Sequence, residues 1–212
     1  MTPNTTPLLL GEAPQSAAVV CVVTHGRGQT PEAMAEHIVS RLSGKGVRFI
    51  LPRAAGGSWY DARAVDPMTD KTRTQLANSL GQLKQAAALA PAGIPVVMVG
   101  FSQGACLSLE YALAFGPWRG ALFGFTGCRV GTPQDHRPSN DLAELPVYLS
   151  GANKDPWIPL PAFASAALEL GVARARLRAD IFPDRQHEVS DVEIEVLQSA
   201  LNQVISGKEV QW

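Results

Sequence analysis

The sequence has 212 residues, of which 46% are hydrophobic and 17% are charged. This balance supplies enough apolar material for one substantial core and predicts a single domain over residues 1–212. The formal net charge is -1, and lysines and arginines are scattered rather than clustered. We therefore expect no strong electrostatic attraction to nucleic acid or to an anionic membrane.

The cysteines and the N-terminal segment argue against further classes of protein. Cys21, Cys106 and Cys128 lie far apart in the sequence. An odd number without Cys-x-x-Cys spacing argues against a disulfide scaffold and a structural zinc site, so no metal is expected. The segment MTPNTTPLLLGEAP has no positively charged start, and no stretch of the chain is long and apolar enough to span a bilayer. These features predict a cytoplasmic protein without integral membrane association.

The first half of the chain alternates apolar runs with helical patterns. Residues 17–23 are rich in β-branched side chains and continuously apolar, as in a strand buried on both faces. Thr30 is the expected N-cap of a helix over 31–42, with proline at its first position. A short strand at 47–51 and a loop then lead to a helical pattern over 69–90.

The second half continues this alternation. Strands are expected at 95–99, 121–125, 147–150 and 176–182, and helices at 103–115, 161–170 and 190–206, the last with a Ser190–Glu193 capping box. The pattern predicts an α/β fold with a mainly parallel sheet, helices on both faces and no cap domain. In such sheets ligands bind at the carboxyl ends of the strands.

A candidate nucleophile lies at one of these strand ends. Residues 100–104 read Gly-Phe-Ser-Gln-Gly and match G-x-S-x-G between a buried strand and an amphipathic helix. In the α/β-hydrolase fold this turn exposes a serine hydroxyl above a helix N-terminus, and its tightness requires both glycines. The motif therefore predicts the α/β-hydrolase fold and Ser102 as nucleophile, against the alternative of an ordinary N-cap serine.

A serine hydroxyl needs a general base, and the chain contains four histidines. His37 falls within a helix, His136 in a polar loop, and His25 precedes the nucleophile. The order in this fold is serine, acid, histidine, so His187, which follows the last strand, is the expected base.

The orienting acid should lie between Ser102 and His187. The aspartates considered are Asp135, Asp141, Asp155, Asp180 and Asp184. Asp155 follows a strand and precedes Pro156, which stiffens its loop, so it is preferred, with Asp184 as the main alternative. A turn-forming Asp-Pro remains the structural interpretation of Asp155.

The oxyanion donors are expected from the loop after the first buried strand and from the residue after the nucleophile. The glycines of His25-Gly26-Arg27-Gly28 allow the backbone to approach a substrate closely. The predicted donors are the backbone amides of Arg27 and Gln103. We expect His25 to support this loop through hydrogen bonds.

Together these segments resemble a known family. The motifs T-H-G-R-G, L-P-R-A-A-G-G-S-W-Y-D, G-F-S-Q-G-A, G-A-N-K-D-P-W-I-P and Q-H-E-V resemble those of the phospholipase/carboxylesterase family, which includes the acyl-protein thioesterases. The resemblance implies a triad of Ser102, Asp155 and His187 and no cofactor. It also implies that Trp59 lines the acyl pocket, although a core position is an equal alternative. Trp157 is a second apolar candidate for substrate binding.

Two residues depart from the family pattern. Gln186 stands where members usually have glycine before the catalytic histidine, and Arg27 stands where the thioesterases usually have an aliphatic residue. His-Gly-Arg-Gly is closer to the bacterial carboxylesterase-like branch, which favours a small-molecule ester over a protein substrate.

The resulting expectation is a serine hydrolase of carboxylic esters, with thioesters and lysophospholipids as further candidate substrates. A non-catalytic ligand-binding protein on the same fold is the main alternative. A peptidase is the third interpretation, but the chain shows no cap domain or propeller that would select peptides.

Overall fold

The computed structural model describes residues 5–212, so the first four residues of the N-terminal segment considered above lie outside it. Seven strands form one sheet in the order β1-β3-β2-β4-β5-β6-β7. The strands are β1 (Leu8–Gly11), β2 (Val19–Thr24), β3 (Val47–Leu51), β4 (Val96–Phe101), β5 (Gly120–Phe125), β6 (Pro146–Ala152) and β7 (Arg176–Phe182). The helices are α1 (Pro31–His37), α2 (Asp70–Ala87), α3 (Gln103–Phe115), α4 (Leu160–Val172) and α5 (Asp191–Ile205), with short 3-10 helices at Val39–Arg41 and Ala55–Gly57.

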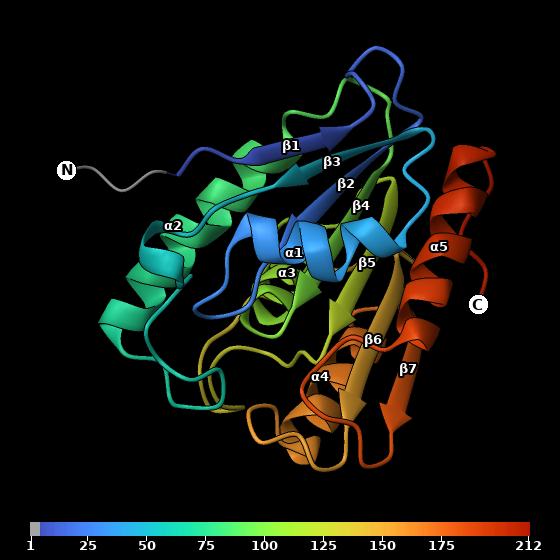
Figure 1. Cartoon of the computed structure of the whole chain (residues 1–212). Helices are drawn as coiled ribbons and strands as arrows, with labels where there is room; N and C mark the ends of the chain where they lie inside the picture. Colours follow the sequence, from blue (N-terminus) through green and yellow to red (C-terminus); the bar gives the residue numbers. More distant parts are fainter. Residues whose placement is uncertain (1–4) are drawn as a thin grey trace.

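All strand pairs except β1 with β3 are parallel, so the carboxyl ends of the other strands lie at one edge of the sheet. Figure 1 shows the arrowheads of β4 to β7 pointing the same way. The register pairs Thr24 on β2 with Gly100 on β4. The loop after β2 and the turn after β4 therefore begin side by side.

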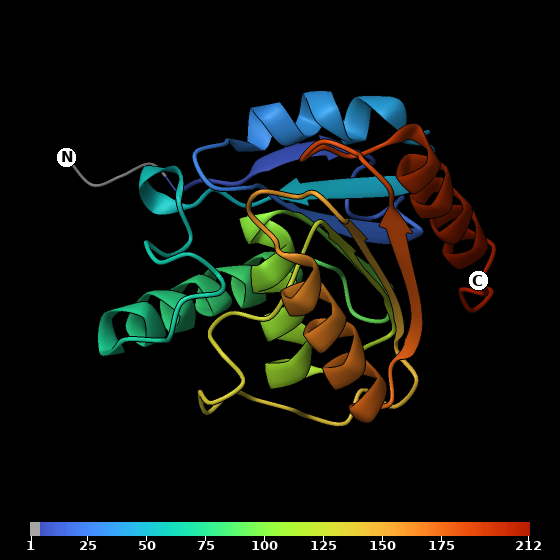
Figure 2. The ribbon, with the colours of Figure 1, turned by 90° about the horizontal axis from the view of Figure 1, so that it is seen from below.

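Helices cover both faces of the sheet, as the continuous apolar runs predict. Figure 2 shows α1 and α5 on one face and α2, α3 and α4 on the other. Neighbouring residues of β4 divide between two cores, because Met98 packs with the α2–α4 side while Val97 and Val99 pack with the α1–α5 side. All six residues of β2 are buried, as expected for a central parallel strand.

Local signals in the sequence account for the starts of α1 and α5. The Thr30 side chain accepts from the Ala33 N–H at the start of α1, and the capping box of α5 is present. The helix expected over 31–42 is wrong beyond residue 37, because Ile38 leaves helical geometry at φ -121 and ψ -59 before a 3-10 turn. Strand β1 was not expected from the sequence.

The core on the α5 side gives a test of stability. Phe123 on β5 is fully buried in this core, so we expect Phe123→Ala to lower the free energy of unfolding by about 3–5 kcal/mol. Leu168 on α4 is 72% exposed, so Leu168→Ala should change it by less than about 0.5 kcal/mol. Urea unfolding of the two variants measures both values, and equal effects would contradict this description of the core.

Candidate active site

Ser102 occupies a strained turn between β4 and α3. Its φ of 55 and ψ of -118 are unusual for a residue with a side chain. A Cβ at Gly100 would lie 2.3 Å from the Gly104 carbonyl oxygen, and one at Gly104 would lie 2.3 Å from that of Thr24. Both glycines of the motif are therefore required for the turn to form.

The side chain of Thr24 joins this turn to β2. Its hydroxyl donates to the carbonyl oxygen of Val99 or of Gly104, at 3.0 and 3.1 Å, and also lies 3.0 Å from the Ser108 hydroxyl. All these atoms are buried, so the hydrogen bonds fix the start of α3 against the neighbouring strand.

Ser102, His187 and Asp155 are joined by hydrogen bonds. The Nε2 atom of His187 lies 2.8 Å from the Ser102 hydroxyl, and its Nδ1 atom lies 2.7 Å from the Asp155 carboxylate. The Asp155 side chain is fully buried, and 18% of the His187 side chain is exposed. The structure thus brings together a hydroxyl, an imidazole and a carboxylate from three distant segments.

Asp155 is held by its own loop. Its second carboxylate oxygen accepts the N–H groups of Trp157 and Ile158 at 2.8 and 2.9 Å. Burial raises the pKa of the Asp155 carboxyl, but the hydrogen bonds from His187 and from these two amides outweigh it and lower the pKa below its ordinary value. The alternative acid, Asp184, is exposed and pairs with Lys154 at 2.5 Å.

His25 lies apart from these three groups and is completely buried. Its Nε2 atom accepts the Ala54 N–H at 3.1 Å, so its Nδ1–H donates to the Gly26 carbonyl oxygen at 2.8 Å. Burial lowers the pKa of His25 and so favours the neutral ring, although the hydrogen bond to Gly26 acts in the opposite direction. His25 thereby connects the loop after β2 to the loop after β3.

Arg27 and Gln103 are placed at the mouth of the site, beside Ser102. Within residues 5–212, neither backbone N–H donates to a protein acceptor. The Arg27 guanidinium donates to the carbonyl oxygens of Asp61, at 2.8 Å, and Ala62. The Arg27 side chain is thus directed toward the loop after β3.

The Gln103 side chain forms hydrogen bonds with the backbone of the same loop. It donates to the Tyr60 carbonyl oxygen at 2.7 Å and accepts the Trp59 N–H at 3.0 Å. Sequence reasoning missed these side-chain contacts, because nothing in the local sequence indicates that residues more than 30 positions apart are joined.

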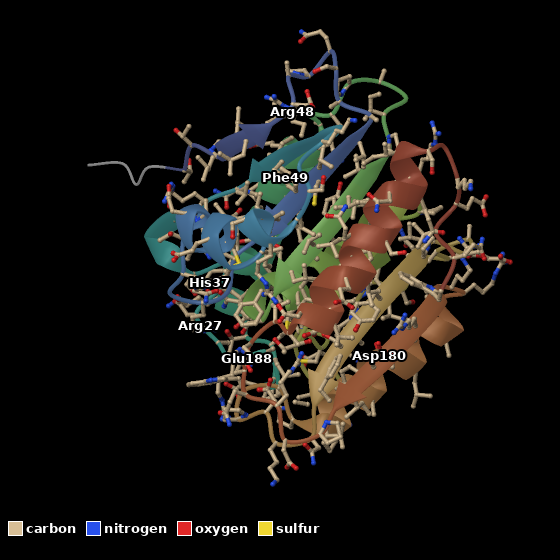
Figure 3. All side chains as sticks on the ribbon, turned by 45° about the vertical axis from the view of Figure 1, so that its right-hand side comes forward. Arg27, His37, Arg48, Phe49, Asp180 and Glu188 are labelled. Carbon is tan, nitrogen blue, oxygen red and sulfur yellow. The ribbon has the colours of Figure 1, made fainter. Side chains whose placement is uncertain are left out.

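A cavity of about 510 Å³ opens beside Ser102 and His187. Its apolar wall contains Tyr60, Val65, Phe101, Cys106, Trp157 and Ile158. Trp157 is 64% exposed and stands at the rim. Figure 3 labels Arg27 and Glu188, which come from two of the loops around the site, at the same end of the sheet.

Trp59 is not among the residues that line this cavity. Its indole is 2% exposed, lies 4.8 Å from the His25 ring and donates to the His25 carbonyl oxygen at 2.8 Å. The structure therefore places Trp59 in the core behind the wall, while its neighbour Tyr60 faces the cavity.

The described residues offer few other reactive groups. The three cysteines are buried and free, with the Cys106 and Cys128 sulfurs 4.0 Å apart. Over residues 5–212, no three His, Cys, Asp or Glu side chains gather in a way that could hold a metal ion. In the same part of the chain, every helix is too short or too polar to cross a membrane.

The sheet, its helices and the strand–serine–helix turn define an α/β-hydrolase. The family model for phospholipase/carboxylesterase matches residues 10–205, so the chain belongs to this family. The predicted fold and the predicted family are therefore confirmed. The chain is an enzyme, a hydrolase of the esterase or thioesterase type.

Solved structures share this fold. A phospholipase/carboxylesterase from Dyadobacter fermentans superposes with a TM-score of 0.80 at 26% identity, covering 95% of this chain and 98% of that one. Acyl-protein thioesterase 2 from Zea mays has a TM-score of 0.77 at 15% identity, covering 95% and 100%. A carboxylesterase from Mesorhizobium loti has a TM-score of 0.67 at 17% identity, covering 92% of each chain. Among curated proteins, the comparison found no match.

The lowered pKa of Asp155 predicts a pH-dependent contribution to stability. Its ionised form stabilises the folded chain above the unfolded-state pKa of about 3.9, and this stabilisation is lost as the pH falls through the lower folded-state value. Asp155→Asn should lack this contribution. Urea unfolding from about pH 6 to about pH 3 should therefore show the difference between wild type and variant shrinking in acid. A difference that stays constant would contradict the lowered pKa.

Proposed function

We propose that this protein is a serine esterase that hydrolyses carboxylic esters of small molecules through an acyl-enzyme. Ser102 is the nucleophile, His187 the general base and Asp155 the orienting acid. The observation that carries the proposal is the unbroken hydrogen-bond line from the Ser102 hydroxyl through both nitrogens of His187 to Asp155, with distances of 2.8 and 2.7 Å.

In the first half-reaction, the Ser102 oxygen attacks the carbonyl carbon of the ester while His187 Nε2 accepts its proton. The negative charge that develops on the carbonyl oxygen is stabilised by the N–H groups of Arg27 and Gln103. Asp155 keeps the imidazole in the tautomer with hydrogen on Nδ1 and stabilises the imidazolium. The proton then passes from His187 to the leaving alcohol, and the acyl group stays on Ser102.

In the second half-reaction, water takes the place of the alcohol. His187 removes a proton from this water as its oxygen attacks the acyl carbon, and the same proton returns to the Ser102 oxygen when the ester bond breaks. The carboxylic acid leaves and the free hydroxyl is restored. No cofactor is needed in either step.

The cavity supports an apolar acyl group as the part of the substrate that is recognised. Its wall is mostly aromatic and aliphatic, and the Arg27 guanidinium is engaged with two backbone carbonyls rather than free for an anionic head group. The family description names phospholipids as well as carboxylic esters, and the Zea mays neighbour is named a thioesterase. Lysophospholipids and thioesters are accordingly the two other substrate classes to compare.

The nucleophile is tested by Ser102→Ala. We expect turnover of p-nitrophenyl butyrate to fall by about 10⁴-fold or more, and labelling by a fluorophosphonate probe to disappear, because the Ser102 hydroxyl is the group that lies 2.8 Å from His187 Nε2. Ser199→Ala, an exposed position on α5, is the matched control and should behave as wild type.

Two outcomes would refute the proposal. An active Ser102→Ala variant would exclude Ser102 as nucleophile. A wild-type protein that neither turns over esters nor reacts with the probe would favour the non-catalytic ligand-binding protein instead.

The acyl pocket is tested by Trp157→Ala. Because a longer acyl chain would bury more of this rim indole, we expect KM for a p-nitrophenyl octanoate to rise about five- to tenfold, with little change for the acetate. Val172→Ala, 86% exposed at the end of α4, serves as the control. An equal change for both esters would show that Trp157 does not contact the acyl chain. Parallel assays with a thioester and a lysophospholipid rank the three substrate classes.

A further inference from the structure

The segment that carries His187 has little backbone structure of its own. It connects the end of β7 at Phe182 to the start of α5 at Asp191. Within residues 183–189 of the described chain, one backbone–backbone hydrogen bond forms, from Glu188 N–H to the Gln186 carbonyl oxygen at 2.9 Å. The position of the imidazole therefore depends on side chains that hold this segment in place.

Asn153 Oδ1 accepts the Asp184 N–H, and Arg41 donates to the Val189 carbonyl oxygen. A single buried carboxylate adds contacts on both sides of the imidazole. Glu193 lies in the first turn of α5, and its side chain is 0% exposed. It accepts hydrogen bonds from the Ser190 N–H and hydroxyl, both at 2.7 Å, and from the Ser150 hydroxyl and the Arg185 guanidinium. The capping box alone needs only the bond from the Ser190 N–H, so this carboxylate does more than cap the helix.

The donors to Glu193 come from both sides of His187. Arg185 precedes the imidazole by two residues, and Ser190 follows it by three. Ser150 belongs to β6, the strand that leads into the loop of Asp155. The Glu193 carboxylate thus fixes the backbone on either side of the proposed base to the strand that delivers its acid.

The cation that pairs with Glu193, the Arg185 guanidinium, is also buried. The Arg185 side chain is 6% exposed, and its guanidinium carbon lies 4.8 Å from the centre of the Phe182 ring. Its Nε and Nη2 atoms have no hydrogen-bond partner among the described residues. Glu193 is therefore the one counter-charge that the guanidinium contacts here, and the ion pair would be broken by neutralising either side chain.

Buried ion pairs add little to stability compared with apolar groups of the same size, whereas breaking one partner is disruptive. Their contribution here is geometrical. We propose that Glu193, paired with Arg185, is a positioning residue that holds His187 between Ser102 and Asp155, an inference that rests on the proposed function. Glu193 touches no reacting atom and acts only through the segment it anchors.

The principal variant is Glu193→Gln, which keeps the size of the side chain and an oxygen for the Ser190 N–H but removes the charge opposite Arg185. We expect kcat for p-nitrophenyl butyrate to fall about 10- to 100-fold, because a displacement of the base by about 1 Å has this effect. KM should stay within about twofold, since the cavity walls at Tyr60 and Trp157 are untouched. The rate constant for fluorophosphonate labelling should fall in parallel with kcat.

Arg185 supplies a second, independent pair of variants. Arg185→Met removes the cation and should lower kcat as Glu193→Gln does, whereas Arg185→Lys retains a charge for Glu193 and should recover most of the loss. If circular dichroism shows that Glu193→Gln does not fold, the two Arg185 variants test the proposal in its place.

Two controls separate positioning from general stability. Glu195→Gln removes an exposed charge two residues away on the same helix. Val204→Ala weakens the core at the far end of α5, where Val204 is 7% exposed. Both controls should keep wild-type kcat, even where Val204→Ala lowers the unfolding midpoint as much as Glu193→Gln.

The inference is overturned if Glu193→Gln and Arg185→Met keep kcat within about twofold of wild type, or if Val204→Ala at equal stability loses as much. The inference also fails if the wild type has no activity that depends on Ser102. That result would refute the proposed function itself, and comparison of the wild type with Ser102→Ala identifies it. A loss in kcat alone, recovered by Arg185→Lys and absent from both controls, supports it.

Discussion

The contact between the first turn of α3 and the end of β2 is the constraint on which the site depends. Gly104 lies against the backbone carbonyls of Thr24 and His25, where a Cβ would come within 2.6 Å of either oxygen. This approach lets Ser102 adopt a positive φ, a conformation that costs about 1–3 kcal/mol. The buried hydrogen bonds of Thr24 and the packing of α3 hold the turn in this state, so the exposed hydroxyl is maintained by the core beneath it.

The same contact couples the proposed oxyanion donors to the wall of the cavity. Gln103, the first residue of α3, and Arg27, in the loop after β2, direct their side chains to the backbone of residues 59–62. His25 adds a bond to Ala54 from beneath. Because the residues proposed as donors also hold the loop of Tyr60, the proposed donors and the wall of the cavity are joined by hydrogen bonds. Electrostatic stabilisation of a transition state requires donors that are held in place.

Local sequence predicted the parallel strands to within about two residues, because most of them are short apolar runs between turn residues and β7 alternates polar with apolar residues. It missed β1 (Leu8–Gly11), whose short run pairs with β3 some 40 residues away and carries no periodic signal of its own. It could also name Ser102, His187 and Asp155 from their places after strands. It could not assign the neighbouring aromatics, because contacts with distant residues set their directions. The Trp59 indole donates to the His25 carbonyl oxygen in the core, and the Gln103 side chain donates to the Tyr60 carbonyl oxygen beside the cavity.

Gln186 and Arg27, the two residues that depart from the family pattern, differ in how many contacts they make. Gln186 is exposed and does not have a positive φ, so nothing in this turn requires the glycine that the family usually has before the histidine. Arg27 is different, because its guanidinium fastens the loop after β3 and lies 5.9 Å from the centre of the Tyr60 ring. An aliphatic residue cannot make these bonds. The arginine also lines the cavity of about 510 Å³, a volume within the usual range of small-molecule sites.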